Sequence, residues 1–413
     1  MSDACFSPEA PAAGRRRGAG KGRQAGAGSV TVLGAQELSA LVPHWEDLAR
    51  NALEPNPFYE HWMLRPALES LGAGLDVRIA AIWCRGELCG LMPLERVARV
   101  RGLPVSALRA WRYRHTLLCT PLIRAGRAAQ CLAALLDWLR SAEGAPLLEL
   151  DFIPSEGPLD GALRDWMKDA KLRSLSDNAH ERPLLRKASD AQTYLADLPS
   201  RQTRELRRRE RRLAERGAVS HVALGPDGDL ERWMEDFLQL EAAGWKGEKG
   251  SAFASTEQGR CFALSILREA FARGRLHMAG IDLDGKPLAR CVSFLGGAGS
   301  FAFKTAYDEK FAAFSPGVIA EIDRIGALHA LPAVRWMDSM TSPDNEVLGR
   351  LWKERLGIHR LLVATRPAGS AVVAALPMLG TLRRAARSTV ARSLRPVAAV
   401  VPATVPHERS SRP

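Results

Sequence analysis

The order of predicted strands and helices is similar in the two halves of the chain, and this repetition is the strongest constraint on the fold. Each half contains a pair of strands joined by a tight turn, at Arg85-Gly86-Glu87 in the first half and at Asp284-Gly285 in the second. Glycine at these positions favours a β-hairpin. In each half a further helix and a buried strand follow, so the pattern predicts a two-lobed α/β protein that arose by tandem duplication. The main predicted helices cover 39–52, 127–142, 201–217, 229–243, 256–273, 317–330 and 344–356.

The chain has 413 residues, which is enough for two ordinary domains. Hydrophobic residues make up 46% and charged residues 25%, values that exclude both wholesale disorder and a small disulfide-stabilised fold. The segments rich in Ala, Gly, Pro and Arg at the two ends lack the apolar residues of a packed domain. We therefore expect a disordered basic tail over 1–28, an N-terminal lobe over 29–185, a C-terminal lobe over 186–367 and a basic Ala/Pro-rich tail over 368–413.

The seven cysteines are scattered, without the paired spacing of a zinc site, and we predict reduced thiols and no bound metal. No apolar stretch is long enough for a signal peptide or a membrane span, which favours a cytoplasmic location. The net charge of +12 is concentrated in the two tails and in the segment 201–216, where eight arginines accompany three glutamates. The remainder of the chain is close to neutral.

The most informative run is FAFKTAYDEKFAAFSPG, in which a predicted strand carrying Lys304 and Tyr307 leads to a helix start at Ser315-Pro316-Gly317. Proline favours the first turn of a helix, and glycine lets a ligand approach the backbone closely. Free amides and the helix dipole at such a position suit a pyrophosphate. An ordinary Pro-Gly helix start is the alternative.

Four blocks in this order resemble a known family: WKGEKGSAF, LDGKPLARCVSF, FKTAYDEKFAAFSPG and DSMTSPDNEVLGRLWKERL. They are similar to the acetyltransferases associated with cellulose and exopolysaccharide biosynthesis. That family is a branch of the GNAT superfamily of N-acetyltransferases and is akin to the tandem-domain peptidoglycan aminoacyl transferases. The resemblance covers about residues 190–365 and extends more loosely over the N-terminal half.

The resemblance implies tandem GNAT-like lobes, each with a mixed, mostly antiparallel sheet flanked by helices, and acyl transfer from acetyl-CoA or another acyl-CoA. It places Ser315, Pro316 and Gly317 at the pyrophosphate of CoA, although the glycine-rich loop of ordinary acetyltransferases is absent here. The residues that match the other blocks are candidates for binding the donor (Lys304) or the acceptor (Trp245, Lys246, Asp308, Ser339, Trp352 and Arg355).

Acyl transfer needs a base for the attacking amine or hydroxyl, and a donor for the oxyanion, which a strand amide can supply. The candidates for the base are Asp338, at the end of a predicted central strand, and Glu241, just before the WKG block. Tyr307 is the candidate acid for the departing thiolate. The structural alternatives are a turn cap for Asp338, a solvated helix end for Glu241 and a packed ring for Tyr307.

The two basic segments have alternatives of their own. The arginines of 201–216 suit phosphate contact, for example with tRNA or the 3′-phosphate of CoA, but no aromatic residue lies between them to stack on bases. Arg–Glu pairs four residues apart favour a solvated face instead. The stretch 379–394 would contact an anionic membrane or nucleic acid if it were helical, and a solvated tail is the alternative.

These observations lead to three hypotheses. The first is an acyl-CoA-dependent acyltransferase, an N-acetyltransferase by resemblance, that acts on an amino sugar, a nucleotide-linked sugar or a polysaccharide precursor. The second is a tRNA-dependent aminoacyl transferase in which the arginine helix binds RNA. The third is a non-catalytic scaffold for polysaccharide export.

Overall fold

Each lobe has at its centre a tight turn between two antiparallel strands, and the two turns have the same backbone conformation. In the first lobe Arg85 and Gly86 have φ values of 55° and 80°, and in the second Asp284 and Gly285 have φ values of 50° and 73°. Two successive residues with positive φ form the turn that matches the twist of a β-hairpin. Both hairpins predicted from the sequence are therefore confirmed, and each starts an antiparallel sheet.

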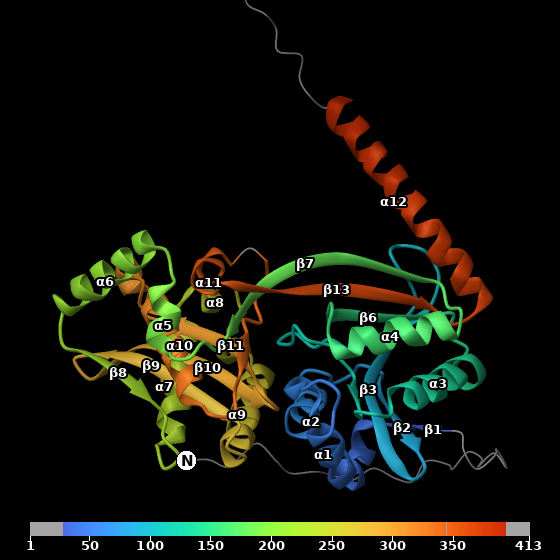
Figure 1. Ribbon diagram of the computed structural model, residues 1–413, viewed down its shortest axis with the longest axis horizontal. Coiled ribbons are helices and arrows are strands. Elements are labelled where there is room, and N and C mark those ends of the chain that lie inside the picture. The colour runs from blue at the N-terminus through green and yellow to red at the C-terminus, as the bar shows by residue number, and fades with distance from the viewer. Residues whose placement is uncertain (1–27, 344, 394–413) are drawn as a thin grey trace, which may run out of the picture.

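The computed structural model describes residues 28–343 and 345–393, and its strands form one continuous 13-stranded sheet that runs through two lobes (Figure 1). The sheet is mostly antiparallel, and helices flank it in both lobes, so the predicted fold class is confirmed. The predictions for 1–27 and for 394–413 lie outside the described residues.

The hydrophobic core of the first lobe is part of a cluster that continues into the second lobe. Its parallel strand pair, β4 with β6, lies between the antiparallel hairpin and the bridging strands. The strands of this lobe are β1 (Ser29–Leu33), β2 (Val77–Cys84), β3 (Glu87–Val97), β4 (Ala107–Ala110), β5 (Leu122–Ile123) and β6 (Leu147–Pro154), and its helices are α1 (Val42–Arg50), α2 (His61–Ser70), α3 (Ala128–Trp138) and α4 (Pro158–Asp169).

The second lobe buries its central strands on both faces. Phe294 of β10 packs in the cluster shared by the two lobes, whereas Cys291 of β10 packs in a separate cluster with residues of α10. Its strands are β8 (Val219–Ala223), β9 (Leu276–Leu283), β10 (Lys286–Gly296), β11 (Gly299–Tyr307) and β12 (Trp336–Asp338). Its helices are α5 (Ala191–Ala196), α6 (Ser200–Ala214), α7 (Leu230–Ala243), α8 (Trp245–Glu248), α9 (Glu257–Ala272), α10 (Pro316–Ala330) and α11 (Glu346–Leu351).

Two long strands join the lobes, β7 (Ser174–Arg186) and β13 (Glu354–Ala364), as Figure 1 shows. β13 comes from the end of the second half but pairs with β6 of the first lobe as well as with β7. The sequence predicted a connecting stretch where β7 lies and a helix over 344–356. The second prediction is wrong at its end, because the chain leaves α11 at Leu351 and enters β13 at Glu354.

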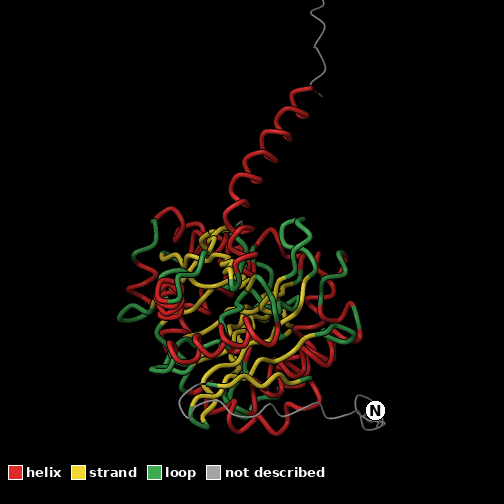
Figure 2. The backbone as a smooth tube through the Cα atoms, turned by 90° about the vertical axis from the view of Figure 1, so that its right-hand side faces the viewer, coloured by secondary structure: helices red, strands yellow, loops and turns green. Residues whose placement is uncertain are grey.

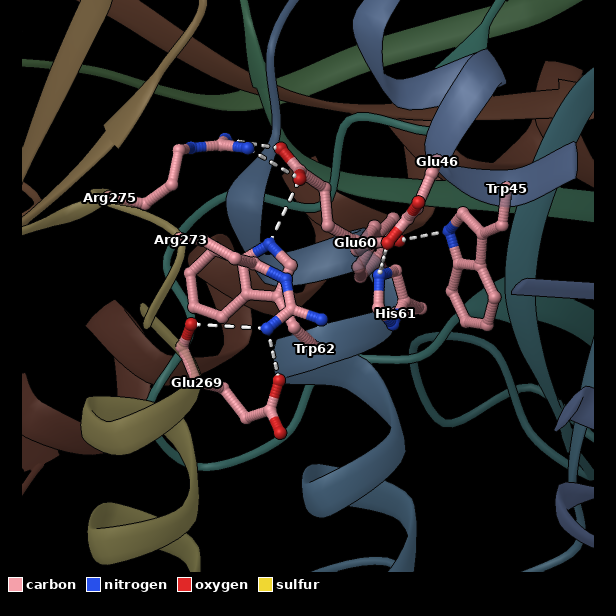
Figure 3. A network of polar contacts seen from close by, with 9 residues as sticks. Trp45, Glu46, Glu60, His61, Trp62, Glu269, Arg273 and Arg275 are labelled. Atoms are coloured by element: carbon pink, nitrogen blue, oxygen red, sulfur yellow. Dashed lines mark hydrogen bonds and ion pairs between the residues drawn. The ribbon is translucent and has the colours of Figure 1, made fainter. Parts of the chain in front are cut away.

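The lobes also meet where α2 faces α9 (Figure 3). Arg275, just before β9, donates to both oxygens of Glu60 at the start of α2, over 2.6 and 2.9 Å, and the Trp62 indole N–H donates to the same carboxylate over 2.9 Å. A bidentate Arg–carboxylate pair fixes orientation as well as distance. The second lobe is thus held in a defined position against the first.

A long helix, α12 (Pro367–Ser393), follows β13 and extends away from both lobes (Figures 1 and 2). Its first turns are anchored because Val373 and Leu376 are buried in a small cluster with β13. The described part of the basic C-terminal segment is helical as far as Ser393. No helix among the described residues has the length and apolar character needed to cross a bilayer.

Candidate functional site

Two parallel strands part in the middle of the second lobe. β11 pairs with β12 only from Gly299 to Phe301, opposite Trp336 to Asp338. β12 then ends, whereas β11 continues to Tyr307 without a strand on that side. A cleft of about 500 Å³ lies at this opening, between the free edge of β11 and helices α10 and α11.

The cleft collects most of the side chains that the sequence singled out. Donor-site and acceptor-site candidates come from different elements, α8, β11, the start of α10 and the end of β12, and they line one connected space. The predicted residues in the cleft wall are Trp245, Lys246, Lys304, Tyr307, Ser315, Gly317 and Ser339.

The first turn of α10 forms one end of the cleft. Ser315 adopts a left-handed conformation (φ 54°), and its carbonyl accepts from the amides of Val318 and Ile319. Pro316 has no N–H, so the Gly317 amide is the one in this turn without a hydrogen bond to another described residue. A Cβ on Gly317 would lie 3.0 Å from the Tyr307 ring, so a larger residue here would require this ring to shift.

An arginine of α6 adds charge at this helix start. Arg209 donates to Ser315 Oγ over 2.7 Å and to Glu205 over 2.9 Å, and it lines the cleft. The cationic guanidinium and the Gly317 amide together form a donor set for an anionic group.

Glu241 lies beneath the cleft between two lysines. Its Oε1 accepts from Lys304 Nζ over 2.7 Å and lies 3.7 Å from Lys246 Nζ, while its Oε2 accepts from the Phe253 amide over 2.8 Å. Lys304 also sits over the Phe253 ring, 4.1 Å from its centre. The Glu241 side chain is fully buried, so the structure places this predicted base where it holds two cations.

The pKa of Lys246 is lowered, first by burial and then by the positive charge of Lys304, although Glu241 opposes the shift. Lys246 Nζ also donates to the Thr305 carbonyl over 3.0 Å. Its amine is therefore positioned in the cleft and neutral in a larger fraction of molecules than an exposed lysine would be.

A second charged pair, Glu321 and Arg324 of α10, lies in the cleft and was not predicted. Arg324 forms an ion pair with Glu321, with 2.9 Å between Nη1 and Oε1, and donates to Glu321 Oε2 over 3.3 Å. Arg324 also donates to Thr305 Oγ1 over 3.1 Å, and Thr305 in turn donates to Glu321. Burial raises the pKa of Glu321. The signal was available, because these residues follow Gly317 by four and seven positions and so share its helix face.

The first lobe packs against residues that adjoin the cleft, since Phe253 lies next to Lys304 of the cleft wall. Arg114 donates to the Gly250 carbonyl over 3.0 Å, and the His115 ring lies 4.3 Å from that of Phe253. Burial, followed by the charge of Lys304, lowers the pKa of His115 to about 3, so this ring is neutral at physiological pH. The first lobe thus packs behind Phe253, one residue removed from the cleft wall.

Asp338 faces away from this cleft. Its Oδ2 accepts from Arg182 Nη2 of β7 over 2.5 Å, and its Oδ1 accepts from the Met340 amide over 3.0 Å. Arg182 also donates to the Leu117 carbonyl of the first lobe. Both side chains are buried, and Asp338 lines a separate pocket between the lobes.

The other predicted residues do not line the cleft. Trp352 is buried in a hydrophobic cluster, and Arg355 donates to three backbone carbonyls at the edge of the inter-lobe pocket. Asp308 caps the short helix at 309–314 by accepting from the Lys310 amide. Asp344, named in one of the resembling blocks, lies outside the described residues. Within 28–343 and 345–393, no cluster of three or more His, Cys, Asp or Glu side chains is arranged to hold a metal ion.

Comparison with known proteins agrees with this geometry. Residues 200–354 match the family model described as "Acetyltransferase (GNAT) domain", and this range contains the whole cleft described above. The second half of the chain is thus similar to GNAT acetyltransferase domains, which supports an acyltransferase. No curated protein matches the chain in sequence.

Solved structures share the two-lobed architecture. A conserved protein of unknown function from Bacteroides thetaiotaomicron has a TM-score of 0.51 at 12% identity, covering 79% of this chain and 97% of that one. FemX has a TM-score of 0.50 at 12% identity, covering 84% of this chain and all of the other. At this identity the likeness establishes the fold alone.

Proposed function

We propose that the chain is an acyl-CoA-dependent acyltransferase that modifies an amino sugar, a nucleotide-linked sugar or a polysaccharide precursor. The observation that carries the proposal is the parting of β11 from β12 over a cleft whose end is the first turn of α10. The match of 200–354 to a GNAT acetyltransferase domain supports it independently.

The donor's diphosphate would be held at the start of α10 by the Gly317 amide, the Ser315 hydroxyl and Arg209. These groups suit a dianion, and the small size of Gly317 permits the close approach. A thioester bound in this way supplies the activated acyl group. Strand amides at the open edge of β11 are positioned to donate to the oxyanion that forms on that group.

The cleft also needs a group that takes a proton from the acceptor and one that returns a proton to the thiolate. We assign the first role to Lys246, because its amine lines the cleft and its pKa is lowered. Tyr307 keeps the proposed role of acid. Glu241 and Asp338 then act as positioning residues, since all their carboxylate oxygens accept hydrogen bonds from other described residues.

The cationic character of the cleft favours an anionic ligand. Lys304 and Arg209 line it together with the balanced pair Glu321 and Arg324, and Glu241 offsets one charge from beneath. A phosphate-bearing acceptor, such as a nucleotide-linked sugar, matches this balance better than a cationic acceptor does.

The test is an assay of free thiol release. Full-length protein is incubated with acetyl-CoA and a panel of amino sugars, nucleotide-linked sugars and oligosaccharides. We expect thiol release that requires both the donor and one class of acceptor. The absence of release with every acceptor, together with no detectable binding of CoA by calorimetry, would contradict the proposal.

Aminoacyl transfer from tRNA is the second candidate, and the arginines of α6 are the observation that favours it. In that case full-length protein would bind tRNA tightly, with an affinity that falls steeply as salt increases, and would not bind CoA.

A further inference from the structure

Three polar side chains outside the cleft connect the strands β7 and β13 to helix α4 (Figure 1). Ser176 of β7 and His359 of β13 are hydrogen-bonded, with 2.7 Å between Ser176 Oγ and His359 Nδ1. The other ring nitrogen of His359, Nε2, lies 3.2 Å from Oδ1 of Asp160 on α4. A hydroxyl, an imidazole and a carboxylate in this order form the arrangement that activates a serine nucleophile. We refer to Ser176, His359 and Asp160 as the serine array.

Exposure decreases along the serine array from the hydroxyl to the carboxylate. Ser176 is exposed, whereas the side chains of His359 and Asp160 leave 8% and 3% of their surface exposed. A nucleophile has to be accessible to its substrate. The groups that take up its proton and stabilise the resulting charge act more strongly where water is excluded. The array meets both requirements, because its hydroxyl is accessible and its imidazole and carboxylate are buried.

The contacts of Asp160 determine which nitrogen of the imidazole can accept a proton. Asp160 Oδ2 lies 2.6 Å from Arg164 Nη2 and accepts from the Glu156 amide over 3.2 Å, so Oδ1 is left to face His359. His359 Nε2 is buried without a hydrogen bond to any described group, so this carboxylate is the acceptor available to its proton. A carboxylate only accepts, which favours the neutral ring with its proton on Nε2. Nδ1 then accepts from the Ser176 hydroxyl.

The backbone beside Ser176 offers donors for a developing oxyanion. On one edge of β7, Ser176 lies opposite Leu361 of β13. On the other edge β12 pairs only from Leu184 to Arg186, and no other strand of the described chain pairs there. Alternate amides of β7 around Ser176 therefore point away from the sheet. Such an amide can donate to the carbonyl oxygen of an acyl group that is bonded to Ser176 Oγ.

We propose that Ser176 is a nucleophile that accepts acyl groups from activated carboxylic esters, at a second reactive site outside the cleft. His359 is its base, and Asp160 positions the imidazole. The strand edge on which Ser176 is exposed provides little binding area for a substrate. The ester must therefore be reactive by itself, with a good leaving group, rather than be activated by extensive binding.

The reaction consists of two steps that balance. Ser176 Oγ attacks the carbonyl carbon of the ester while its proton passes to His359 Nδ1. The bond from this carbon to the leaving oxygen breaks, and His359 returns the proton to that oxygen. The products are an acyl ester on Ser176 and a free alcohol. Water then attacks the acyl ester, with its proton again passing through His359, and releases a carboxylic acid and the original hydroxyl.

The experiment measures acylation of full-length protein by p-nitrophenyl acetate, an activated ester that contains no CoA. We expect a burst of about one p-nitrophenolate per chain, and peptide mass mapping should find the acetyl group on Ser176. Ser176→Ala should abolish the burst. Ser174→Ala is the matched control and should retain it, because Ser174 is exposed on the same strand but lies opposite Val363, four residues from His359.

A variant of the base separates activation of Ser176 from simple exposure. His359→Gln should slow acetylation of Ser176 by about 10²–10⁴-fold, the usual contribution of a positioned base. Thermal unfolding followed by circular dichroism shows whether this variant is folded. If it is not folded, the wild-type protein still decides the question, since exposure alone would lead to similar acetylation rates at Ser174 and Ser176.

The role of Asp160 has its own measurement. Asp160→Asn should slow acetylation of Ser176, because the ring proton of His359 is no longer held on Nε2. Nitrogen NMR of the imidazole should show this proton on Nε2 in wild-type protein and on Nδ1 in the variant. A purely structural contact between α4 and β13 would not produce this change of tautomer.

Three results would overturn the inference. They are acetylation of Ser176 no faster than that of Ser174 in wild-type protein, an unchanged rate in folded His359→Gln, and an unchanged rate and tautomer in Asp160→Asn. Any of them would identify the serine array as a structural contact only. All three would leave the proposed function in place, because the probe does not use the donor site of the cleft. Conversely, a failure to bind CoA would contradict the proposed function without affecting this inference.

Discussion

The two lobes contain the same arrangement of parallel strands but use it differently. In the first lobe β4 runs parallel to β6 at Leu108 and Arg109, and in the second β11 runs parallel to β12. After β4 the opening is filled, because Trp111 and Tyr113 are buried there. After the paired part of β11 a cleft of about 500 Å³ remains.

Hydrogen bonds fix the filling of the first lobe. The Tyr59 hydroxyl donates to the Trp111 carbonyl over 2.8 Å, and the Tyr113 hydroxyl donates to the Phe58 carbonyl over 3.2 Å. Parted strands are therefore not sufficient for a site. The residues that follow the parting decide whether the space becomes a core or a cleft, and here the space is core in the first lobe and a cleft in the second.

The largest expected effect is on activity, at a residue of the second lobe's cleft. Lys246→Met should lower kcat by about 10²–10⁴-fold, the usual contribution of a general base, with little change in CoA affinity. Lys246→Arg should not restore activity, since a guanidinium stays protonated. Steady-state thiol release measures both.

Lys286 is an exposed lysine at the start of β10, outside the cleft, and it provides the control for this prediction. Lys286→Met should have wild-type kcat. Because the pKa of Lys246 is lowered, activity should rise with pH and level off below the usual lysine range. Full activity in Lys246→Arg would rule out the assigned role.

The buried ion pair between Arg182 and Asp338, at the point where β11 and β12 part, should contribute strongly to the free energy of unfolding. Asp338→Ala leaves Arg182 buried without its carboxylate, and we expect the free energy of unfolding to fall by about 3–5 kcal/mol. The double variant Arg182→Met/Asp338→Leu should recover much of this loss. Urea unfolding measures both. A stable but inactive Asp338→Ala protein would instead support a direct catalytic role.

The filled opening of the first lobe should behave as core. Trp111→Ala should lower the free energy of unfolding by about 3–5 kcal/mol and leave CoA affinity unchanged while the protein is folded. In the second lobe, Trp245 is 47% exposed, and Trp245→Ala should change stability by no more than about 0.5 kcal/mol. Loss of CoA binding in folded Trp111→Ala would contradict the statement that the first lobe's opening is core and takes no part in binding.

The smallest effect concerns the attachment of α6 to the second lobe. Burial alone would lower the pKa of His221, but Asp323 at 2.8 Å and Glu210 at 3.4 Å raise it overall. The stability from this cluster is thus fully present below about pH 6.5 and is lost as pH rises through the raised pKa.

Partly exposed pairs contribute about 0.2–1 kcal/mol, so the loss should be of this size. Urea midpoints of wild-type protein and His221→Gln, compared between pH 5.5 and 8.5, measure it, where these pH values bracket roughly one unit below and two above the ordinary histidine pKa. A difference between the two proteins that stays constant, or grows with pH, would contradict the assignment.

Much of the fold could be predicted from local sequence. The Asp-Gly hairpin turn and the amphipathic helices α7 and α9 depend on nearby residues, and the predicted ranges 229–243 and 256–273 agree with them closely. β7 could not be predicted in the same way. Its first half is polar and exposed, and it becomes a strand because β13 pairs along it.

The same difference between local and long-range contacts applies to the residues of the candidate site. The sequence singled out Gly317 and Lys304 because their short motifs have a physical meaning within one segment, and both residues line the cleft. The roles of Glu241 and Asp338 depend on partners from distant segments, Lys304 and Arg182, which are 63 and 156 residues away. Spacing in the sequence cannot show that such carboxylates are already occupied.

Titration of CoA into full-length protein by calorimetry tests the central claim most directly. The account predicts one site per chain, since the second lobe has the open cleft and the first lobe is filled, and it predicts that Gly317→Leu abolishes binding by placing a side chain against Tyr307. Two sites per chain, or undiminished binding in Gly317→Leu, would contradict it.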